Sequence, residues 1–442
     1  MVIGLDATPP RLLYEDFKDD LPTLSQIVDD GCRFLLKSCH PPITIPAWMA
    51  MVTGKTPGEL GMYGFRHRKP GSYNDFYIAN FNSVKHPTVW DILGFKGYRS
   101  IVVSVPPTYP PRPLRGYLIS CFITPNTKVM YTFPPMLKRE IEDIVGEYIF
   151  DVKFRSPERD RVKRDLWVMA ERRFRVLEYL ASTKKWDFFM FVEIGVDRVQ
   201  HAFWGYMDPE HHKYTPGNRY EHVIRDYYRL IDEKLLKLLK QVPKDTVLVI
   251  VSDHGAKRMK GAFTINQWLV ERGYLKVKKK PPKPGVELKD VNVDWSKSIA
   301  WGWGGYYARV FLNVKGREPH GVIDPKDYEH YRDELRDELL KIRGPNGERW
   351  NTKVYKPEEL YPKVDGDPPD LIVYFDDLYW RSAGTLGWPT NYLKENDRGP
   401  DDAVHDWNGV FTVYDPEGTM NSGFKGEIDI LKVKDVLLTF YQ

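Results

Sequence analysis

The sequence has few cysteines and no long hydrophobic run, and each shortage excludes a class of protein. Only three cysteines occur in 442 residues, at Cys32, Cys39 and Cys121. They lack metal-type spacing and cannot all pair within one chain, so we expect a reduced, cytoplasmic protein rather than a disulfide-stabilised one. No apolar stretch approaches the roughly 20 residues that cross a membrane, since the best runs only from Val247 to Val251. We therefore expect no membrane association.

An excess of one charge is also missing. The 65 Lys and Arg residues nearly balance the 61 Asp and Glu residues, which leaves a net charge of +4. We expect no specific nucleic-acid binding, and the basic run 276–280 is typical of a solvated loop. The chain opens directly on the strand-like stretch Met1–Asp6, which argues against a signal peptide and again favours a cytoplasmic location.

What the sequence does contain is an alternation of buried strands and amphipathic helices. Four apolar, partly β-branched runs are typical of buried parallel strands: 2–5, 100–104, 188–192 and 246–251. Two helical faces lie between them, Leu166, Ala170, Phe174, Leu177 and Ala181 after a Ser156-Pro157 cap, and Ile224, Tyr228, Ile231, Leu235 and Leu238. This order predicts an α/β fold with a doubly wound, mostly parallel sheet and helices on both faces.

Two segments interrupt the alternation. Residues 106–155 are rich in Pro and aromatic residues, and residues 273–365 begin with the basic, Pro-rich stretch. We interpret both as insertions, or caps, beside the edge of the sheet at which the parallel strands end. The core is then assembled from residues 1–105, 156–272 and 366–442.

Asp and His residues recur just after the predicted strands. They are Asp6, Asp197, His201, Asp253 and His254, and His405 precedes a further apolar run at 409–413. Ligands of open α/β sheets bind at the carboxyl ends of the strands, so these residues are candidate metal ligands. Asp197 and His201 are four residues apart and can share one helical face, as two ligands of one ion require. A turn, a cap or a surface ion pair explains each residue taken alone, but not the ordered set.

Thr44 stands out in the stretch Pro41-Pro42-Ile43-Thr44-Ile45-Pro46, directly before the apolar run 47–52. One interpretation is a helix N-cap, whose loss costs about 1 kcal/mol. The other is a nucleophile at the positive end of the helix, where a neighbouring divalent ion favours deprotonation of its hydroxyl. Both roles are compatible with the same position.

Other motifs for phosphate or acyl chemistry are incomplete. Gly54-Lys55-Thr56 resembles the end of a phosphate-binding P-loop, but Met49 stands where the upstream glycine is required. A G-x-S-x-G nucleophile elbow is absent from the sequence.

As an ordered set, these residues resemble the alkaline phosphatase superfamily, in its type I phosphodiesterase/nucleotide pyrophosphatase family and its cytoplasmic archaeal and bacterial branch. The resemblance rests on Asp6, Thr44-Ile-Pro-Ala-Trp with Thr53-Gly54, Asp197-x-x-x-His201, Ser252-Asp-His-Gly255 and His405. It implies a metal-dependent phosphoric ester hydrolase that forms a covalent intermediate on Thr44. It also implies one ion held by Asp6, Thr44, Asp253 and His254, and a second held by Asp197, His201 and His405.

Several points stay open at this level. Asp and His ligands without Cys suit two Zn²⁺ ions best, with Mn²⁺ as the alternative. The substrate implied is a small phosphate ester, nucleotides included. The family's phosphate-binding asparagine is replaced by Phe65, which leaves Phe65 and Arg66 as the expected substrate contacts. Alternative functions are a phosphomonoesterase or phosphomutase on the same site, or an inactive metal-stabilised binding protein.

Overall fold

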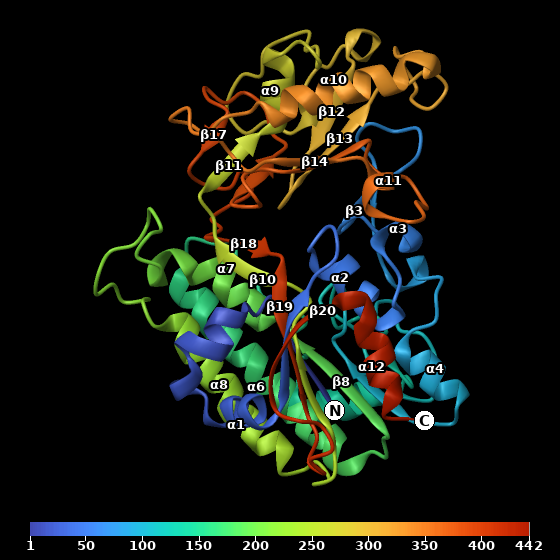
Figure 1. Cartoon of the computed structure of the whole chain (residues 1–442), viewed down its shortest axis with the longest axis vertical. Coiled ribbons are helices and arrows are strands. Elements are labelled where there is room, and N and C mark those ends of the chain that lie inside the picture. Colours follow the sequence, from blue (N-terminus) through green and yellow to red (C-terminus); the bar gives the residue numbers. More distant parts are fainter. Residues whose placement is uncertain (442) are drawn as a thin grey trace. The chain divides into compact units, whose positions relative to one another are not determined.

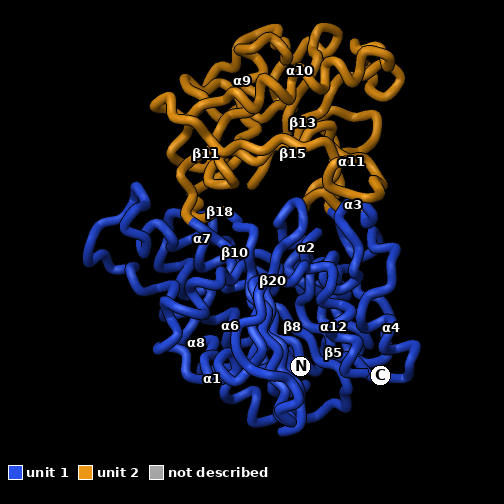
Figure 2. The backbone as a smooth tube through the Cα atoms, in the orientation of Figure 1, with its two compact units in different colours: residues 1–60, 79–257, 405–442 blue, residues 61–78, 258–404 orange. Residues whose placement is uncertain are grey.

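The structure is a computed structural model, and it describes residues 1–441. Within these residues the chain forms two compact units, coloured separately in Figure 2. Unit 1 contains residues 1–60 and 79–257 and the described part of the chain from 405 onward, and unit 2 contains residues 61–78 and 258–404. Each unit has its own sheets and helices.

Unit 1 is built on a large sheet whose strand order, among the described residues, is β20-β2-β19-β9-β1-β8-β5-β6-β7. Its strands are β1 (Val2–Leu5), β2 (Cys32–Lys37), β5 (Ser100–Val103), β6 (Gly116–Ile119), β7 (Thr132–Phe133), β8 (Phe188–Glu193), β9 (Leu248–Val251), β19 (Asn408–Tyr414) and β20 (Gly423–Asp429). The five central strands β9-β1-β8-β5-β6 are parallel to one another. β19 is antiparallel to both β9 and β2. A mostly parallel sheet of this kind has to be buried on both faces.

Helices cover both faces of this sheet. The helices of unit 1 are α1 (Pro22–Asp30), α2 (Thr44–Thr53), α3 (Pro57–Leu60), α4 (Val89–Phe95), α5 (Leu137–Val145), α6 (Arg159–Thr183), α7 (Gly195–Met207), α8 (Val223–Leu239) and α12 (Val433–Thr439). Figure 1 shows α1, α6 and α8 on one side of the sheet and α2, α4 and α12 on the other. The predicted doubly wound α/β fold is therefore confirmed.

The predicted helical faces are also confirmed. All ten apolar residues assigned to the inner faces of the two long helices are buried in α6 and α8. The start of α6 differs from the prediction, because the helix begins at Arg159 and Glu158 precedes it. The Ser156 hydroxyl instead accepts the backbone N–H of Glu158, in the turn before the helix.

Unit 2 has a core of its own. Its strands are β3 (Arg66–Arg68), β4 (Phe76–Ile78), β11 (Gly261–Thr264), β12 (Ala300–Trp303), β13 (Ala308–Leu312), β14 (Lys353–Tyr355), β15 (Leu371–Tyr374), β16 (Trp380–Ala383) and β17 (Tyr392–Leu393), and its helices are α9 (Ile265–Glu271), α10 (Tyr328–Leu340) and α11 (Pro357–Leu360). The antiparallel sheet β12-β13-β15-β14 packs against α9 and α10. Trp301 is fully buried in this core.

The two units group the chain differently from the predicted segments. Residues 106–155 belong to unit 1, because β6 and β7 within them extend the main sheet. Unit 2 starts earlier and ends later than the predicted insertion at 273–365, and it also takes residues 61–78. The proposal that both predicted segments act as caps stays a prediction. Among the described helices, none combines the length and the apolar character that crossing a membrane requires.

Candidate active site

Three aspartates of unit 1 follow three neighbouring strands of its sheet. Asp6 directly follows β1, Asp253 lies two residues after β9, and Asp197 lies in the first turn of α7, which follows β8. β1 pairs in parallel with both β8 and β9, so these three strands end at the same edge of the sheet. All three carboxyl groups are buried.

Three histidines complete two clusters of side chains. His201 lies one turn after Asp197 on α7, His254 follows Asp253, and His405 lies in β18 (Ala403–Asp406). One cluster contains Asp197, His201 and His405, and the other contains Asp6, Asp253 and His254. Apart from Thr44, these are the two sets that the family resemblance implied, and the chain brings them together from four of its parts.

The donor atoms in each cluster are spaced as ligands of one ion. His201 Nε2 lies 3.1 Å and His405 Nε2 lies 3.9 Å from Asp197 Oδ1. In the other cluster, His254 Nε2 is 3.2 Å from Asp253 Oδ2 and 4.0 Å from Asp6 Oδ1. Ligands bound at about 2.0–2.2 Å to a tetrahedral ion lie roughly 3.3–3.6 Å from one another. Both clusters match this spacing closely enough to hold an ion after small adjustments.

Each aspartate keeps one oxygen without a hydrogen-bond partner. Asp6 Oδ2 accepts from Trp48 Nε1 at 2.7 Å, Asp197 Oδ2 accepts from Arg198 Nη1 at 2.6 Å, and Asp253 Oδ1 accepts from the Ala7 N–H at 3.3 Å. The other oxygens, Asp6 Oδ1, Asp197 Oδ1 and Asp253 Oδ2, are buried and accept no hydrogen bond. These three are the oxygens that face the histidine nitrogens. Buried carboxylate oxygens are costly without a partner, so this donor set fits metal ions.

Backbone carbonyls orient two of the histidines. The ring Nδ1 of His405 is 2.7 Å from the carbonyl of Pro42, and that of His254 is 2.9 Å from the carbonyl of Gly255. A carbonyl only accepts, so each Nδ1 carries the proton and each Nε2 directs its lone pair into its cluster. Burial lowers the pKa of His254 to about 4. Burial lowers the pKa of His405 well below its ordinary value, and the repulsion that its charged form would meet from His254 and His201 lowers it further. The rings of His254 and His405 are therefore neutral, as metal binding requires.

The carboxyl groups create a local excess of buried negative charge. Burial and the nearby Asp197 raise the pKa of Asp6 well above its ordinary value, and burial and Asp6 do the same for Asp253. For Asp197, burial also acts to raise the pKa, but His201 and Arg198 outweigh it and hold the pKa well below its ordinary value. Divalent cations would remove the repulsion that opposes ionisation of Asp6 and Asp253.

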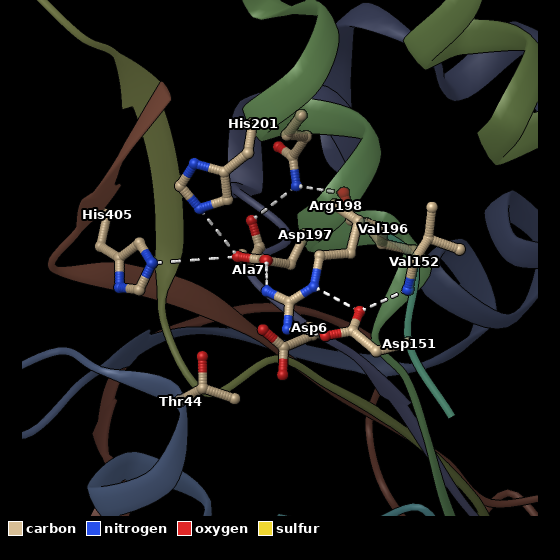
Figure 3. A network of polar contacts seen from close by, with 12 residues as sticks. Asp6, Ala7, Thr44, Asp151, Val152, Val196, Asp197, Arg198, His201 and His405 are labelled. Carbon is tan, nitrogen blue, oxygen red and sulfur yellow. Dashed lines mark hydrogen bonds and ion pairs between the residues drawn. The ribbon is translucent and has the colours of Figure 1, made fainter. Parts of the chain in front are cut away.

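Arg198 is a component of the site that the sequence analysis missed. Besides Asp197, its guanidinium contacts both oxygens of Asp151, at 2.8 Å from Nε and 2.9 Å from Nη2, and Figure 3 shows this chain of contacts. A signal existed for Arg198, because its charge lies directly beside Asp197 in α7, where most other residues are apolar. Asp151 gave no local signal, since it lies 47 residues away in the sequence.

Thr44 is buried at the amino end of α2, beside the cluster of Asp6, Asp253 and His254. The prediction of an N-cap is wrong, because Thr44 is the first helical residue and Ile43 occupies the cap without a side-chain hydrogen bond. The Thr44 hydroxyl lies 3.4 Å from His254 Nε2. One turn later on the same helix, Trp48 binds Asp6. Helix α2 therefore places a hydroxyl and a hydrogen-bond donor to a carboxylate on its side facing the site.

Phe65 and Arg66 belong to unit 2. Arg66 is exposed in the β3–β4 hairpin, with its guanidinium 4.7 Å from the centre of the Phe76 ring. A role of either residue in binding substrate stays a prediction.

Solved structures with a similar fold cover nearly the whole chain. Phosphonoacetate hydrolase from Sinorhizobium meliloti 1021, in complex with phosphonoacetate, aligns with a TM-score of 0.62 at 15% identity, over 99% of this chain and 94% of that one. Human ectonucleotide pyrophosphatase/phosphodiesterase 5 aligns with a TM-score of 0.58 at 14% identity, over 99% and 93% of the two chains. An inactive variant of the murine protein in complex with AMP aligns with a TM-score of 0.56 at 14% identity, over 99% and 93%. These similarities support the alkaline phosphatase-like fold.

The family assignment comes from the sequence match. No match was found among curated protein sequences. The family described as type I phosphodiesterase/nucleotide pyrophosphatase matches residues 1–401, a range that contains every residue of the two clusters except His405. The chain is thus a phosphoric ester hydrolase of the alkaline phosphatase superfamily, and it belongs to the type I phosphodiesterase/nucleotide pyrophosphatase family.

Proposed function

We propose that the protein hydrolyses small phosphodiesters or pyrophosphate linkages, nucleotides included, with Thr44 as the covalent nucleophile. The observation that carries this proposal is the set of three buried, unpartnered carboxylate oxygens beside a buried threonine hydroxyl. Neither a helix cap nor core packing explains such a set.

The residues of the two clusters would hold two divalent ions. Asp6, Asp253 and His254, together with Thr44, would bind one, and Asp197, His201 and His405 the other. Oxygen and imidazole donors without thiolate suit Zn²⁺, and Mn²⁺ is the alternative. When bound, such ions supply positive charge that favours the threonine alkoxide and stabilises the charge that develops on the phosphoryl group and the leaving group.

The chain's own residues then perform the positioning. Thr44 Oγ1 attacks phosphorus, the bond from phosphorus to the leaving oxygen breaks, and the leaving group takes up the proton that the threonine hydroxyl loses. The intermediate is a phosphothreonine that still carries the second ester group of the substrate. The amino end of α2 favours the negative charge that accumulates around Thr44 during this step. In the second step water attacks the same phosphorus, the bond from phosphorus to Thr44 Oγ1 breaks, the threonine oxygen takes up the proton that the water loses, and a phosphate monoester is released. Asp6, held by Trp48, keeps its orientation through both steps.

The preference for diesters follows from the family and is tested by a substrate panel. We expect the metal-loaded protein to cleave bis-p-nitrophenyl phosphate and an aryl nucleotide diester faster than p-nitrophenyl phosphate. Phosphonoacetate belongs in the same panel, because a protein of similar fold is a phosphonoacetate hydrolase. Markedly faster cleavage of the monoester, or of phosphonoacetate, would reject the diester assignment.

Variants of Thr44 test the nucleophile. Thr44→Ala is expected to lower turnover by several orders of magnitude, whereas Thr44→Ser keeps the hydroxyl and should retain appreciable activity. Metal content should change little in both, because Asp6, Asp253 and His254 remain as ligands. Thermal unfolding should also change little, because Thr44 makes no capping hydrogen bond. Near-normal turnover by Thr44→Ala would remove Thr44 from the mechanism.

A further inference from the structure

Arg309 of unit 2 is a buried guanidinium without a carboxylate partner. Its side chain lies on β13, and the residue is only 9% exposed. Five other buried arginines each form an ion pair with at least one carboxylate, and they are Arg68, Arg173, Arg198, Arg332 and Arg381. The buried Arg159 donates to the carbonyls of Phe154 and Ser156. Within the described residues, Arg309 has no carboxylate partner. A buried charge that lacks a counter-ion is costly, so the exception requires a physical reason.

The contacts that Arg309 does make leave most of its donors unused. Its Nη1 donates to the backbone carbonyl of Arg66, and the guanidinium lies 5.2 Å from the centre of the Trp303 ring. A guanidinium has several N–H donors arranged as a planar fork that matches carboxylate and phosphate oxygens. No other hydrogen bond from the Arg309 guanidinium is found within residues 1–441. Burial and the neighbouring positive charge of Arg66 lower the pKa of Arg309, with Tyr307 opposing them.

A second arginine and an apolar surface lie beside it. The exposed Arg66 guanidinium stacks on Phe76, and the Phe76 ring meets that of Trp303 edge to face at 6.5 Å between centroids. Phe76, Tyr77 and Ile78 form the whole of β4 and are 41%, 41% and 49% exposed. Strand β4 pairs with β3, which carries Arg66. The acidic groups of this region are already engaged, since Arg68 pairs with Glu318 and Asp367.

We propose that Arg309 and Arg66, with Phe76 and Trp303, form a binding site in unit 2 for an organic phosphate that carries an aromatic group. The phosphate oxygens supply the acceptors that Arg309 lacks and neutralise the two adjacent arginines. The exposed ring of Phe76 and the half-buried ring of Trp303 supply a surface on which the aromatic group packs, as in cation–π and stacking contacts. This site uses no residue of the two aspartate–histidine clusters, so it stands independently of the proposed function.

A purely structural role for Arg309 makes the opposite prediction. If Arg309 served only to hold the Arg66 carbonyl and to pack on Trp303, replacing Arg309 would destabilise the protein. If instead it is held as an unpaired charge for an anion, Arg309→Met removes that charge while keeping a long apolar side chain. The variant is then as stable as the parent, or more stable, when no anion is present.

The experiment measures binding of phenylphosphonate, a stable aryl anion, by calorimetry and by thermal unfolding of the full chain. It is run with metal present and with chelator, since the clusters of unit 1 bind anions only through metal whereas this site needs none. Arg272→Met is the matched control, because Arg272 also lies over a tryptophan ring, Trp268, but is exposed at the end of α9. We expect Arg309→Met to weaken the chelator-resistant binding at least tenfold and to abolish the rise in Tm. Arg272→Met should behave like the parent.

Two sources of the anion are distinguished by kinetics. If the aryl phosphate is part of the hydrolysed ester, Arg309→Met raises KM for a diester bearing an additional phosphate and leaves KM for bis-p-nitrophenyl phosphate unchanged. If it is a separate ligand, both KM values stay unchanged while the loss of phenylphosphonate binding persists. The proposal is overturned if Arg309→Met binds phenylphosphonate as the parent does, or if it unfolds at a markedly lower temperature without anion.

Discussion

In each of the three aspartates of the active site, one carboxylate oxygen accepts a hydrogen bond from a protein donor and the other has no hydrogen-bond partner. The donors differ in kind: an indole N–H for Asp6, a guanidinium for Asp197 and a backbone N–H for Asp253. The backbone donor belongs to Ala7, whose φ of 57° lies in the left-handed region that non-glycine residues seldom adopt. Strain of this kind persists where the surrounding structure imposes it, and it is frequent at functional sites. The donors therefore decide which oxygen of each carboxylate remains for an ion.

Arg198 gives the clearest test of this arrangement. Arg198→Lys keeps the positive charge but cannot contact Asp197 and both oxygens of Asp151 at once. We expect the dissociation constant of the ion at Asp197, His201 and His405 to rise about 10–100-fold. Affinity at the other cluster should change much less, because Asp6 and Asp253 have their own donors. Competition titration with a chromophoric chelator measures both constants.

Two results would count against that account of Arg198. Equal weakening at both clusters would indicate a general loss of structure, and unchanged affinity at both would show that Arg198 does not orient Asp197. Trp48→Phe serves as the complementary variant, since it removes the donor to Asp6 and should weaken the other ion instead.

At the scale of single elements, strand β3 contains a buried histidine that makes stability depend on pH. His67 Nε2 accepts the backbone N–H of Tyr63 at 2.8 Å, which requires the neutral ring. Burial, with Arg309 as a smaller cause, lowers the pKa of His67 from 6.5 to about 3. The unfolded chain therefore binds the proton below pH 6.5 while the folded chain does not. The stabilising contribution of the neutral ring is complete above pH 6.5 and is lost as the pH falls toward 3.

We expect the stability of the protein to fall more steeply with decreasing pH than that of a variant that has no titrating side chain at position 67. The free energy of unfolding of unit 2 should fall by about 1.4 kcal/mol per pH unit between pH 6 and 4, relative to His67→Gln. Urea unfolding of both proteins at a series of pH values measures this difference. Parallel pH profiles would show that His67 is protonated in the folded state or exposed to water.

Elements also show what could be predicted from the sequence. The strands 2–5, 100–104 and 188–192 were predictable because continuous apolar, β-branched runs have few alternatives in an α/β chain. The short strand β6 could not be predicted, because the prolines around it are typical of a loop. Its pairing with β5 is a contact in space that the sequence pattern does not reveal. Thr44 lay near the predicted helix start, but a cap and a first helical residue differ by one position, which sequence rules do not resolve.

The site illustrates the same limit. The residues that bear an ordered motif, such as Asp253 and His254, were predictable because their order along the chain is itself a signal. The residues that orient them were not, since Asp151, Ala7 and the Pro42 carbonyl are recognised only by what lies beside them in space.

At the scale of the whole molecule, removal of metal should affect the two units unequally. Elemental analysis of protein purified without chelator should find close to two divalent ions per chain. Chelation leaves Asp6 and Asp253 buried and mutually repulsive, so hydrogen exchange in β1 and β9 should accelerate. Exchange in β13 and β15 should stay unchanged, because the candidate ligands all lie in unit 1. Equal acceleration in both units, or none, would contradict this account.

The central claim is that Thr44 carries the phosphoryl group during turnover, and trapping that intermediate tests it most directly. The metal-loaded protein is mixed with bis-p-nitrophenyl phosphate, quenched with acid within the first turnover, digested and examined by mass spectrometry. The account predicts a nitrophenyl phosphoryl group on the peptide containing Thr44, located on Thr44 by fragmentation and absent from Thr44→Ala. A rapid burst of nitrophenol with no modification of Thr44 at any quench time, or modification of a different residue, would contradict it.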